Sequence, residues 1–482
     1  MADRVELVDP IEANPVETTL AEDAFFGHPR GLGWLSATEF WERFSYYGMQ
    51  ALLVLYMAHR LLLPGHVEHI AGFVVLRAAL EGVYGPLSPQ ALASVIFGLY
   101  AGLVYVTPIA GGLLADRAFG RTRTVALGAC LMAAGHFLMA SEAAFLLALL
   151  FLLIGAGCFK GNLAVQVGTL YPPGDPRVDD AFQLYYVAIN LAVIASPLVC
   201  GTLGEHYGYH WGFGAAGAGM VIGLAIYLYG RKWLRPEQPT RRSNNIASRE
   251  QLRPGELTRV IALLLLVPVL GVSLVGNYQI FNAYLLWAEL NYQLQIFGMT
   301  MPVTWILSLS CIITVGTLAA SMLFWRWWSK HHAEPSEIAK IVLGAFLMAC
   351  APLILAAASY FVASTGHKVT LMWAVVFELV NDFGYANVVP VGLALYSRSA
   401  PKAVGGMMTG AFYILFFVAN MLVGWIGGFL DRMPGTEFWL LHSAVVFSAV
   451  LLLLVARGAL QRVLTPAAES INPLAPMGTS TA

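Results

Sequence analysis

The sequence has little charge. Only 11% of its 482 residues are charged, and 58% are apolar. A soluble domain carries about 25% charged residues, so this composition excludes an ordinary water-soluble globular protein. It indicates an integral membrane protein.

Several other features are missing. The five cysteines show no paired spacing, so we expect free thiols and no disulfides. No Gly-x-x-x-x-Gly-Lys-Ser/Thr loop is present, which argues against ATP as the energy source. The period-two alternation of transmembrane barrel strands is absent, so the spans are expected to be helices. The adjacent His331 and His332 fit a solvated helix end better than a metal site, and we expect neither a metal nor a cofactor.

About twelve apolar windows are long enough to cross a bilayer. Roughly 20 helical residues are needed to cross ~30 Å of hydrocarbon at ~1.5 Å per residue. We therefore predict an all-α integral membrane protein with twelve transmembrane helices. The windows lie near 34–60, 91–114, 123–142, 145–168, 182–206, 212–233, 259–284, 302–328, 338–362, 370–396, 404–429 and 437–457.

The lysines and arginines indicate the orientation, because cytoplasmic loops retain positive charge. If the N-terminus is cytoplasmic, only Arg60, Arg77, Lys368 and Arg432 fall in loops on the far side. We expect both termini in the cytoplasm and the chain in the plasma membrane, as in a bacterial inner membrane.

A polar interruption rich in Arg, Pro and Asn divides the spans into two groups of six. Two six-helix bundles are typical of secondary transporters, whose sites lie at the interface between repeats. A shorter connection over 61–90 predicts an external segment between the first two spans. The predicted domains are a cytoplasmic tail at 1–30, a six-helix bundle at 31–233, a cytoplasmic linker at 234–258, a second six-helix bundle at 259–460 and a cytoplasmic tail at 461–482.

The first span carries ionisable side chains. Glu39, Glu42 and Arg43 stand at i, i+3 and i+4, which places them on one helix face. Charges inside a bilayer are costly and persist where they face a cavity or one another. The cluster favours a transport pathway in which Glu42 exchanges cationic neighbours for a proton. The alternative is a structural ion pair that joins this span to Lys160 of the fourth.

The loop between the second and third spans runs from Gly111-Gly112 through Asp116-Arg117 to Arg121. It resembles the signature loop of the major facilitator superfamily. The resemblance implies close helix packing at the glycines and a cytoplasmic gating network around Asp116 and the arginines. A basic loop that contacts anionic lipid is the alternative.

Three further stretches carry motifs. They are Glu39-x-x-Glu42-Arg43-Phe-x-Tyr46-Tyr47-Gly48, Gly155-x-Gly157-x-Phe159-Lys160-Gly161-Asn162, and Asp175-x-Arg177 followed by Tyr185-Tyr186 and Asn190. Together they resemble the proton-dependent oligopeptide transporter family, densely over the first six spans and more thinly beyond them.

This resemblance implies a proton-coupled symporter that imports di- or tripeptides, or similar zwitterionic solutes, by alternating access. Protons are then the coupling ion, lipid surrounds the chain, and neither a nucleic acid partner nor enzymatic activity is expected. An intramembrane enzyme would need a nucleophile or metal beside the acids, and no span supplies one. The residues that match the family's pattern are Glu39, Glu42, Arg43 and Lys160 for proton coupling, and Arg43, Tyr47, Tyr105, Lys160 and Asn190 for substrate. We also assign Tyr278, Ser310, Asp382 and Tyr385 to substrate binding, and Gln50, Asp116 and Arg117 to gating.

The sequence departs from the family's pattern at the external gate. Gln50 stands where the family has an arginine, and Tyr278, just before Gln279, stands where it has an acid. Because both partners of a salt bridge are missing together, no unpaired charge is left in a low dielectric. We expect the external gate to close through hydrogen bonds of Gln50 with Tyr278 or Asn277.

A third departure concerns the tenth span. Tyr385 replaces a glutamate that the family places five residues before Pro390, and Asp382 and Glu378 lie one and two turns earlier. We hypothesise that Asp382 receives the substrate's amino group. Alternatively, both acids only line an external vestibule or pair with Lys368. A separate alternative for the function is a transporter of the same fold whose solute lacks an amino group, such as an organic anion or a modified peptide.

Overall fold

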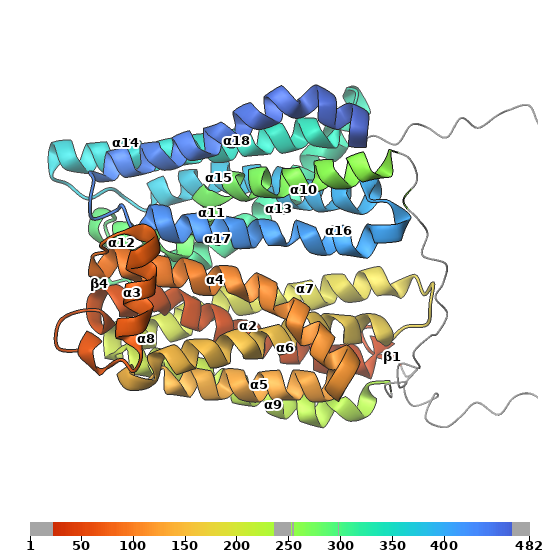
Figure 1. Ribbon diagram of the computed structural model, residues 1–482, viewed down its shortest axis with the longest axis horizontal. Coiled ribbons are helices and arrows are strands. Elements are labelled where there is room, and N and C mark those ends of the chain that lie inside the picture. Colours follow the sequence, from red (N-terminus) through yellow and green to blue (C-terminus); the bar gives the residue numbers. More distant parts are fainter. Residues whose placement is uncertain (1–22, 236–251, 253–254, 297, 465–482) are drawn as a thin grey trace, which may run out of the picture. The chain divides into compact units, whose positions relative to one another are not determined.

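Helices make up nearly all of the described chain. The computed structural model describes residues 23–235, 252, 255–296 and 298–464 (Figure 1). The first part contains β1 (Asp23–Phe25), β2 (His28–Pro29), α2 (Arg30–Tyr56), α3 (Phe73–Tyr84), α4 (Pro89–Leu114), α5 (Arg121–Leu138), α6 (Phe145–Thr169), α7 (Arg177–Ser196), α8 (Thr202–Tyr207) and α9 (Tyr209–Gly230). The second part contains α10 (Glu256–Ser273), α11 (Val275–Tyr278), α12 (Ala283–Asn291), β3 (Gln295–Ile296), β4 (Met299–Thr300), α13 (Trp305–His331), α14 (Glu337–Thr365), α15 (Met372–Ser399), α16 (Gly405–Phe412), α17 (Ile414–Gly427) and α18 (Gly435–Leu464). β1 pairs with β2 and β3 with β4, each pair antiparallel.

The predicted spans fall on these helices or on consecutive helices. In the described part, nine helical runs are long and apolar enough to cross a membrane. α2, α5 and α15 have 27, 18 and 28 residues but carry more polar or charged side chains. The all-helical fold is therefore confirmed, whereas the number of twelve crossings stays a prediction.

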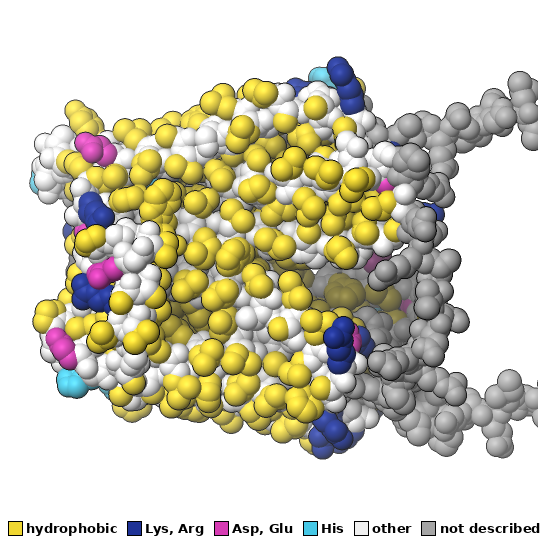
Figure 2. All heavy atoms as spheres, in the orientation of Figure 1, with side chains coloured by type: hydrophobic (Ala, Val, Ile, Leu, Met, Phe, Trp, Pro, Cys, Tyr) yellow, Lys and Arg dark blue, Asp and Glu magenta, His cyan; other side chains and the backbone are white. Residues whose placement is uncertain are grey.

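Apolar side chains cover the outer surface of the long helices. On the face drawn in Figure 2, hydrophobic side chains cover the middle of the helices and charged side chains gather near their ends. Leu265, Leu323 and Val455 are each more than half exposed. Such large apolar surfaces are unfavourable in water and favourable in lipid. This arrangement fits an integral membrane protein.

The predicted span at 259–284 is wrong as a single helix. α10 ends at Ser273, and Asn282 leaves the helical region with φ −124° and ψ −117°. The side-chain amide of Asn282 donates a hydrogen bond to the Val423 carbonyl at 3.2 Å. A polar side chain thus holds the broken segment against α17, which hydropathy alone does not reveal. The connection at 61–90 also contains a helix, α3, that was not predicted.

The described chain folds into two compact units. In the first, which holds residues up to Ala79 and from Val106 to 235, α2 packs against α7 and α9, and α5 packs against α6. In the second, which holds Leu80–Tyr105 and the described residues from 252 onward, α14 packs against α15 and α18. The predicted domain boundaries, which follow the order of the chain, stay a prediction, and most of the linker lies outside the described residues.

Gly111 of α4 lies directly against α6. A Cβ atom at Gly111 would stand 2.0 Å from the Gly157 carbonyl oxygen, so only glycine fits. A Cβ atom at Gly112 would meet nothing within 4 Å. The close packing that the family loop implied is therefore correct for Gly111 and wrong for Gly112.

Candidate functional site

Arg43 lies between two buried carboxylates on α2. Its Nε atom is 2.6 Å from Oε1 of Glu39 and 3.2 Å from Oε2 of Glu42. Glu39 is 1% exposed and Glu42 is 0% exposed. The helical spacing alone brings the three groups together, because residues three and four apart share a face. One guanidinium faces two acids here.

Lys160 of α6 lies beside this cluster. Its Nζ atom is 3.8 Å from the centroid of the Tyr46 ring, and its charge acts on Glu42 and Glu39. The structure therefore brings together the four residues that were expected to couple protons. Tyr185 of α7 also lies beside Glu39, and sequence reasoning did not include it in the site. The motif Tyr185-Tyr186 was the available signal.

The carboxylates of this cluster have few hydrogen bonds. Neither oxygen of Glu42 accepts one, and Oε2 of Glu39 accepts none. Buried carboxylates normally accept several hydrogen bonds, so these oxygens are held by charge alone. A cation that withdraws from Glu42 would leave it uncompensated, and a proton is the simplest replacement.

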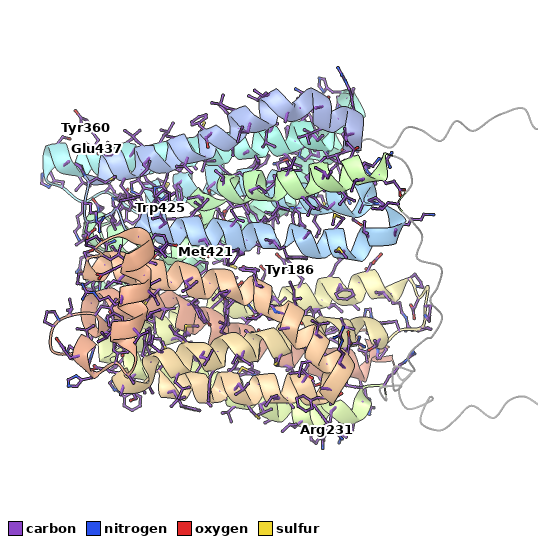
Figure 3. All side chains as sticks on the ribbon, viewed as in Figure 1. Tyr186, Arg231, Tyr360, Met421, Trp425 and Glu437 are labelled. Carbon is purple, nitrogen blue, oxygen red and sulfur yellow. The ribbon has the colours of Figure 1, made fainter. Side chains whose placement is uncertain are left out.

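Other predicted residues of the first unit lie nearby or apart. The Tyr47 ring packs edge to face on Tyr46 at 5.1 Å. The Asn190 side chain donates to the Tyr186 carbonyl of its own helix at 2.8 Å, and Tyr186 is exposed (Figure 3). Gln50 is buried, and its Oε1 accepts no hydrogen bond. The roles of Tyr47, Asn190 and Gln50 stay predictions.

Asp116 of the expected gating network contacts one of the arginines of the same loop, while its role in gating stays a prediction. Asp116 and Arg117 lie on a π-helical turn at Ala115–Phe119 that follows α4. Nη2 of Arg121 donates to Oδ1 of Asp116 at 3.1 Å. Asp116 is thus paired with Arg121, whereas Arg117 is exposed on the same turn.

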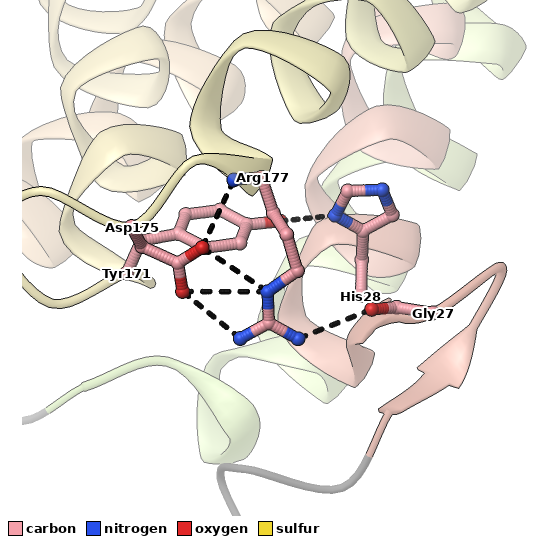
Figure 4. A network of polar contacts seen from close by, with 5 residues as sticks. All are labelled: Gly27, His28, Tyr171, Asp175 and Arg177. Atoms are coloured by element: carbon pink, nitrogen blue, oxygen red, sulfur yellow. Dashed lines mark hydrogen bonds and ion pairs between the residues drawn. The ribbon is translucent and has the colours of Figure 1, made fainter.

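The Asp175-x-Arg177 motif holds the β1–β2 hairpin (Figure 4). The Arg177 guanidinium donates from Nη2 to Asp175 Oδ2 at 2.9 Å and from Nη1 to the Gly27 carbonyl at 3.2 Å. His28 and Tyr171 are joined by a 2.9 Å hydrogen bond between Nδ1 and the phenol. The Arg177 hydrogen bonds lower the pKa of Asp175, which lies between α6 and α7. The motif is therefore a structural clamp in this unit.

Asp382 is the centre of a polar cluster in the second unit. It is 1% exposed on α15 and accepts three hydrogen bonds from neutral donors. Thr314 of α13 donates to Oδ2 at 2.6 Å, while Asn277 of α11 and the adjacent Asn381 donate to Oδ1 at 3.2 and 3.3 Å. Sequence reasoning missed Thr314 and Asn381. It had placed Asn277 at the gate with Gln50, and that pairing stays a prediction.

Glu378 lies one turn before Asp382 and is also 1% exposed. The Ser310 hydroxyl of α13 lies beside Glu378 and acts on its carboxyl group, but neither Glu378 oxygen accepts a hydrogen bond of normal geometry. Lys368 donates to the backbone carbonyl of Glu289 at 3.0 Å. The alternative in which Lys368 pairs with these acids therefore has no support.

Three predicted tyrosines lie in the second unit. The Tyr105 and Tyr278 hydroxyls are 3.5 Å apart, and both rings pack on Phe416. Tyr385 packs against the hydrophobic core of the same unit. Tyr105 and Tyr278 are thus brought together, whereas their contact with substrate stays a prediction.

Comparisons with known proteins agree on one family. A family model described as "POT family" matches residues 122–252. The chain is 29% identical to the peptide transporter YePEPT of Yersinia enterocolitica, with 89% of this chain and 94% of that protein covered. It is 28% identical to a di-/tripeptide transporter of Lactococcus lactis, with 90% and 96% covered. In each of these comparisons the chain is similar to peptide transporters of the POT family.

Solved structures of POT transporters have a similar fold. A crystal structure of a peptide transporter POT in complex with sulfate superposes with a TM-score of 0.78 at 26% identity. The match covers 94% of this chain and 99% of the other. A variant of a peptide transporter POT in complex with alafosfalin superposes with a TM-score of 0.79 at 26% identity, covering 94% and 100%. The helical arrangement of the chain is therefore the family's fold, a major facilitator fold.

Proposed function

We propose that this protein is a proton-coupled symporter that imports di- or tripeptides, or similar small zwitterionic solutes, by alternating access. The observation that carries the proposal is the buried cluster of Glu39, Glu42 and Arg43 with Lys160 beside it. Relatives named as di-/tripeptide transporters support the class of substrate. Protons are the coupling ion, and transport requires neither covalent chemistry nor another cofactor.

Coupling follows from the charges of this cluster. When a substrate carboxylate binds Arg43 and Lys160, Glu42 loses its counter-ions. A buried carboxylate without a counter-ion binds a proton, because its charged form is disfavoured in a low dielectric. Proton binding therefore strengthens substrate binding, and substrate binding strengthens proton binding by the same factor.

The substrate's amino group has its own acceptor in this proposal. Asp382 supplies a buried negative charge in the second unit and receives the ammonium group. The remaining substrate contacts come from Tyr47, Tyr105, Asn190, Tyr278, Ser310 and Tyr385, and gating involves Gln50, Asp116 and Arg117. The protein works in the plasma membrane, as in a bacterial inner membrane, with both termini in the cytoplasm.

Uptake into proteoliposomes tests the proposal. Purified protein is reconstituted, an inward proton gradient is imposed, and accumulation of a labelled dipeptide is measured. We expect concentrative uptake that unlabelled di- and tripeptides inhibit and that a protonophore abolishes. A failure of every peptide in a panel to accumulate would overturn the proposal and favour a receptor or scaffold.

One observation favours a second candidate. Asp382 already accepts three hydrogen bonds from Thr314, Asn277 and Asn381, and Tyr385 replaces the family's acid. A solute without a free amino group, such as an organic anion or a modified peptide, would suit this arrangement. Competition separates the two candidates, because an N-acetylated dipeptide would then inhibit uptake as well as the plain dipeptide does.

A further inference from the structure

The acids of α15 differ sharply in their hydrogen bonding. Asp382 accepts three hydrogen bonds and can stay ionised, because donors that favour the charged form surround it. Glu378 is equally buried, but neither of its oxygens accepts a hydrogen bond of normal geometry, and the Ser310 hydroxyl is the one side-chain donor recorded beside it among the described residues. A carboxylate in that environment is far more costly than a neutral carboxylic acid. The two acids are therefore not equivalent.

A second group at the same place also has a buried oxygen that accepts no hydrogen bond of normal geometry. Asn381 is 1% exposed and turns its amide nitrogen toward Asp382, whereas its Oδ1 accepts no hydrogen bond. The two Glu378 oxygens and Asn381 Oδ1 are thus three buried acceptors that receive no hydrogen bond of normal geometry. Buried polar atoms normally have hydrogen-bond partners, so this cluster has fewer donors than its buried acceptors need.

No cation compensates these acids among the described residues. The titratable groups whose charges act on Glu378 or Asp382, besides the two acids themselves, are Cys311 of α13, Tyr284 of α12 and Tyr292 just after it. Thiols and phenols are neutral or negative, never positive. None of them replaces a counter-ion. A proton needs no room, whereas an organic cation beside Glu378 would have to displace packed side chains.

We propose that Glu378 binds a second transported proton, in addition to the proton at Glu42. A proton from the external water bonds to a Glu378 carboxylate oxygen, and it leaves to the cytoplasmic water when transport exposes that oxygen. This inference rests on the proposed function, in which Asp382 receives the ammonium group.

Charge balance supports the assignment. When the substrate's ammonium group lies at Asp382 and Glu378 is protonated, the two acids and the ammonium group together carry no net charge. The cluster of α2 balances in the same way, because one ionised acid and the substrate carboxylate offset Arg43 and Lys160 once Glu42 is protonated. A low-dielectric interior favours such neutral sets over sets with excess charge.

Proton stoichiometry is the decisive measurement. In proteoliposomes with the membrane potential clamped at zero, a pH difference of one unit supports about tenfold accumulation of a neutral dipeptide per coupled proton. Alanylalanine therefore accumulates about 100-fold with two coupled protons and about tenfold with one. We expect the Glu378→Gln variant to lose at least tenfold in this ratio while it still exchanges internal for external dipeptide.

The control is Glu437→Gln, which changes an exposed glutamate at the start of α18 (Figure 3) and should leave the ratio unchanged. Equal ratios in the wild type and the Glu378→Gln variant would overturn the inference. So would a wild-type ratio of about tenfold, which decides the matter even if the variant does not fold. No accumulation by the wild type would instead overturn the proposed function.

Infrared difference spectroscopy gives a readout that does not depend on transport. A protonated carboxyl group shows a C=O stretching band that a carboxylate and a glutamine side chain lack. We expect this band in the dipeptide-bound wild type and in the Glu437→Gln variant, with part of it lost in the Glu378→Gln variant. An identical band in all three proteins would contradict a proton on Glu378.

Discussion

The Nε atom of Arg43 lies 2.6 Å from Oε1 of Glu39, one helical turn earlier on α2. Removing one partner of a buried ion pair typically costs about 3–5 kcal/mol. We expect Arg43→Ala to lower the free energy of unfolding by about 3 kcal/mol at neutral pH, because Glu39 and Glu42 lose their cation. Thermal unfolding of the purified protein in detergent measures the loss.

Arg60→Ala is the matched control. Arg60 pairs with Glu142 at 3.3 Å, but its side chain is 49% exposed. Exposed pairs contribute about 0–1 kcal/mol, so this variant should unfold almost like the wild type. An equal loss in both variants would show that burial does not govern the strength of the Arg43 pair.

Glu42→Gln tests the coupling step directly. Glutamine cannot exchange a proton, so the variant should lose accumulation driven by a pH gradient. Exchange of internal for external dipeptide needs no net proton movement and should continue. Both assays are run on the same proteoliposomes, with Glu437→Gln as the control. If the Glu42→Gln variant still concentrates dipeptide, Glu42 does not couple proton and substrate movement.

The cluster of α2 could be predicted from sequence because it is local. Glu39, Glu42 and Arg43 occupy one face of one helix, and the helical period places them together. The donors to Asp382 could not be predicted, since Thr314 and Asn277 are 68 and 105 residues away along the chain. Their positions beside Asp382 depend on how α11, α13 and α15 pack.

The interruption of a helix within a span could not be predicted from the sequence either. Asn282 interrupts the predicted span at 259–284, and its amide bonds to Val423 of a distant helix. Hydropathy measures the cost of transfer to lipid and does not report which backbone groups a side chain satisfies. The existence of the spans was therefore predictable, whereas their interruptions were not.

Gly111 and Gly112 allow a sharp test of helix packing. Alanine is favoured over glycine inside a helix by about 1 kcal/mol, so Gly112→Ala should be neutral or stabilising. Gly111→Ala should destabilise by about 1–3 kcal/mol, because its Cβ would overlap the Gly157 carbonyl of α6. Thermal unfolding in detergent compares the two neighbours. Similar shifts for both would mean that α4 and α6 do not pack closely at Gly111.

The Asp175–Arg177 clamp predicts a pH dependence. Hydrogen bonds from Arg177 lower the pKa of Asp175 below its ordinary value in the folded protein. Its stabilising contribution is therefore present above the ordinary aspartate pKa of about 4 and is lost as pH falls through the lower folded value. Asp175→Asn should remove this contribution at neutral pH. Faster amide hydrogen exchange in the β1–β2 hairpin would report the loss.

Asp179→Asn is the control for that experiment. Asp179 lies two residues beyond Arg177 and is exposed at the start of α7. It should leave exchange in the hairpin unchanged. If the hairpin amides exchange equally slowly in the wild type and in the Asp175→Asn variant, the Asp175–Arg177 clamp does not stabilise the hairpin.

Asp382→Asn tests whether this acid receives the substrate's amino group. The variant should fold, because an asparagine oxygen can still accept from Asn277 and Asn381, and its nitrogen can donate to the Thr314 hydroxyl. A hydrogen bond to a charged group contributes about 1.5–3 kcal/mol, so the KM for a plain dipeptide should rise about ten- to hundredfold.

Thr314→Val keeps the negative charge and should raise this KM far less. An N-acetylated dipeptide has no ammonium group, so its uptake or inhibition should not respond to Asp382→Asn. Unimpaired uptake of the plain dipeptide by that variant would exclude Asp382 from the amine site and favour a solute without a free amino group.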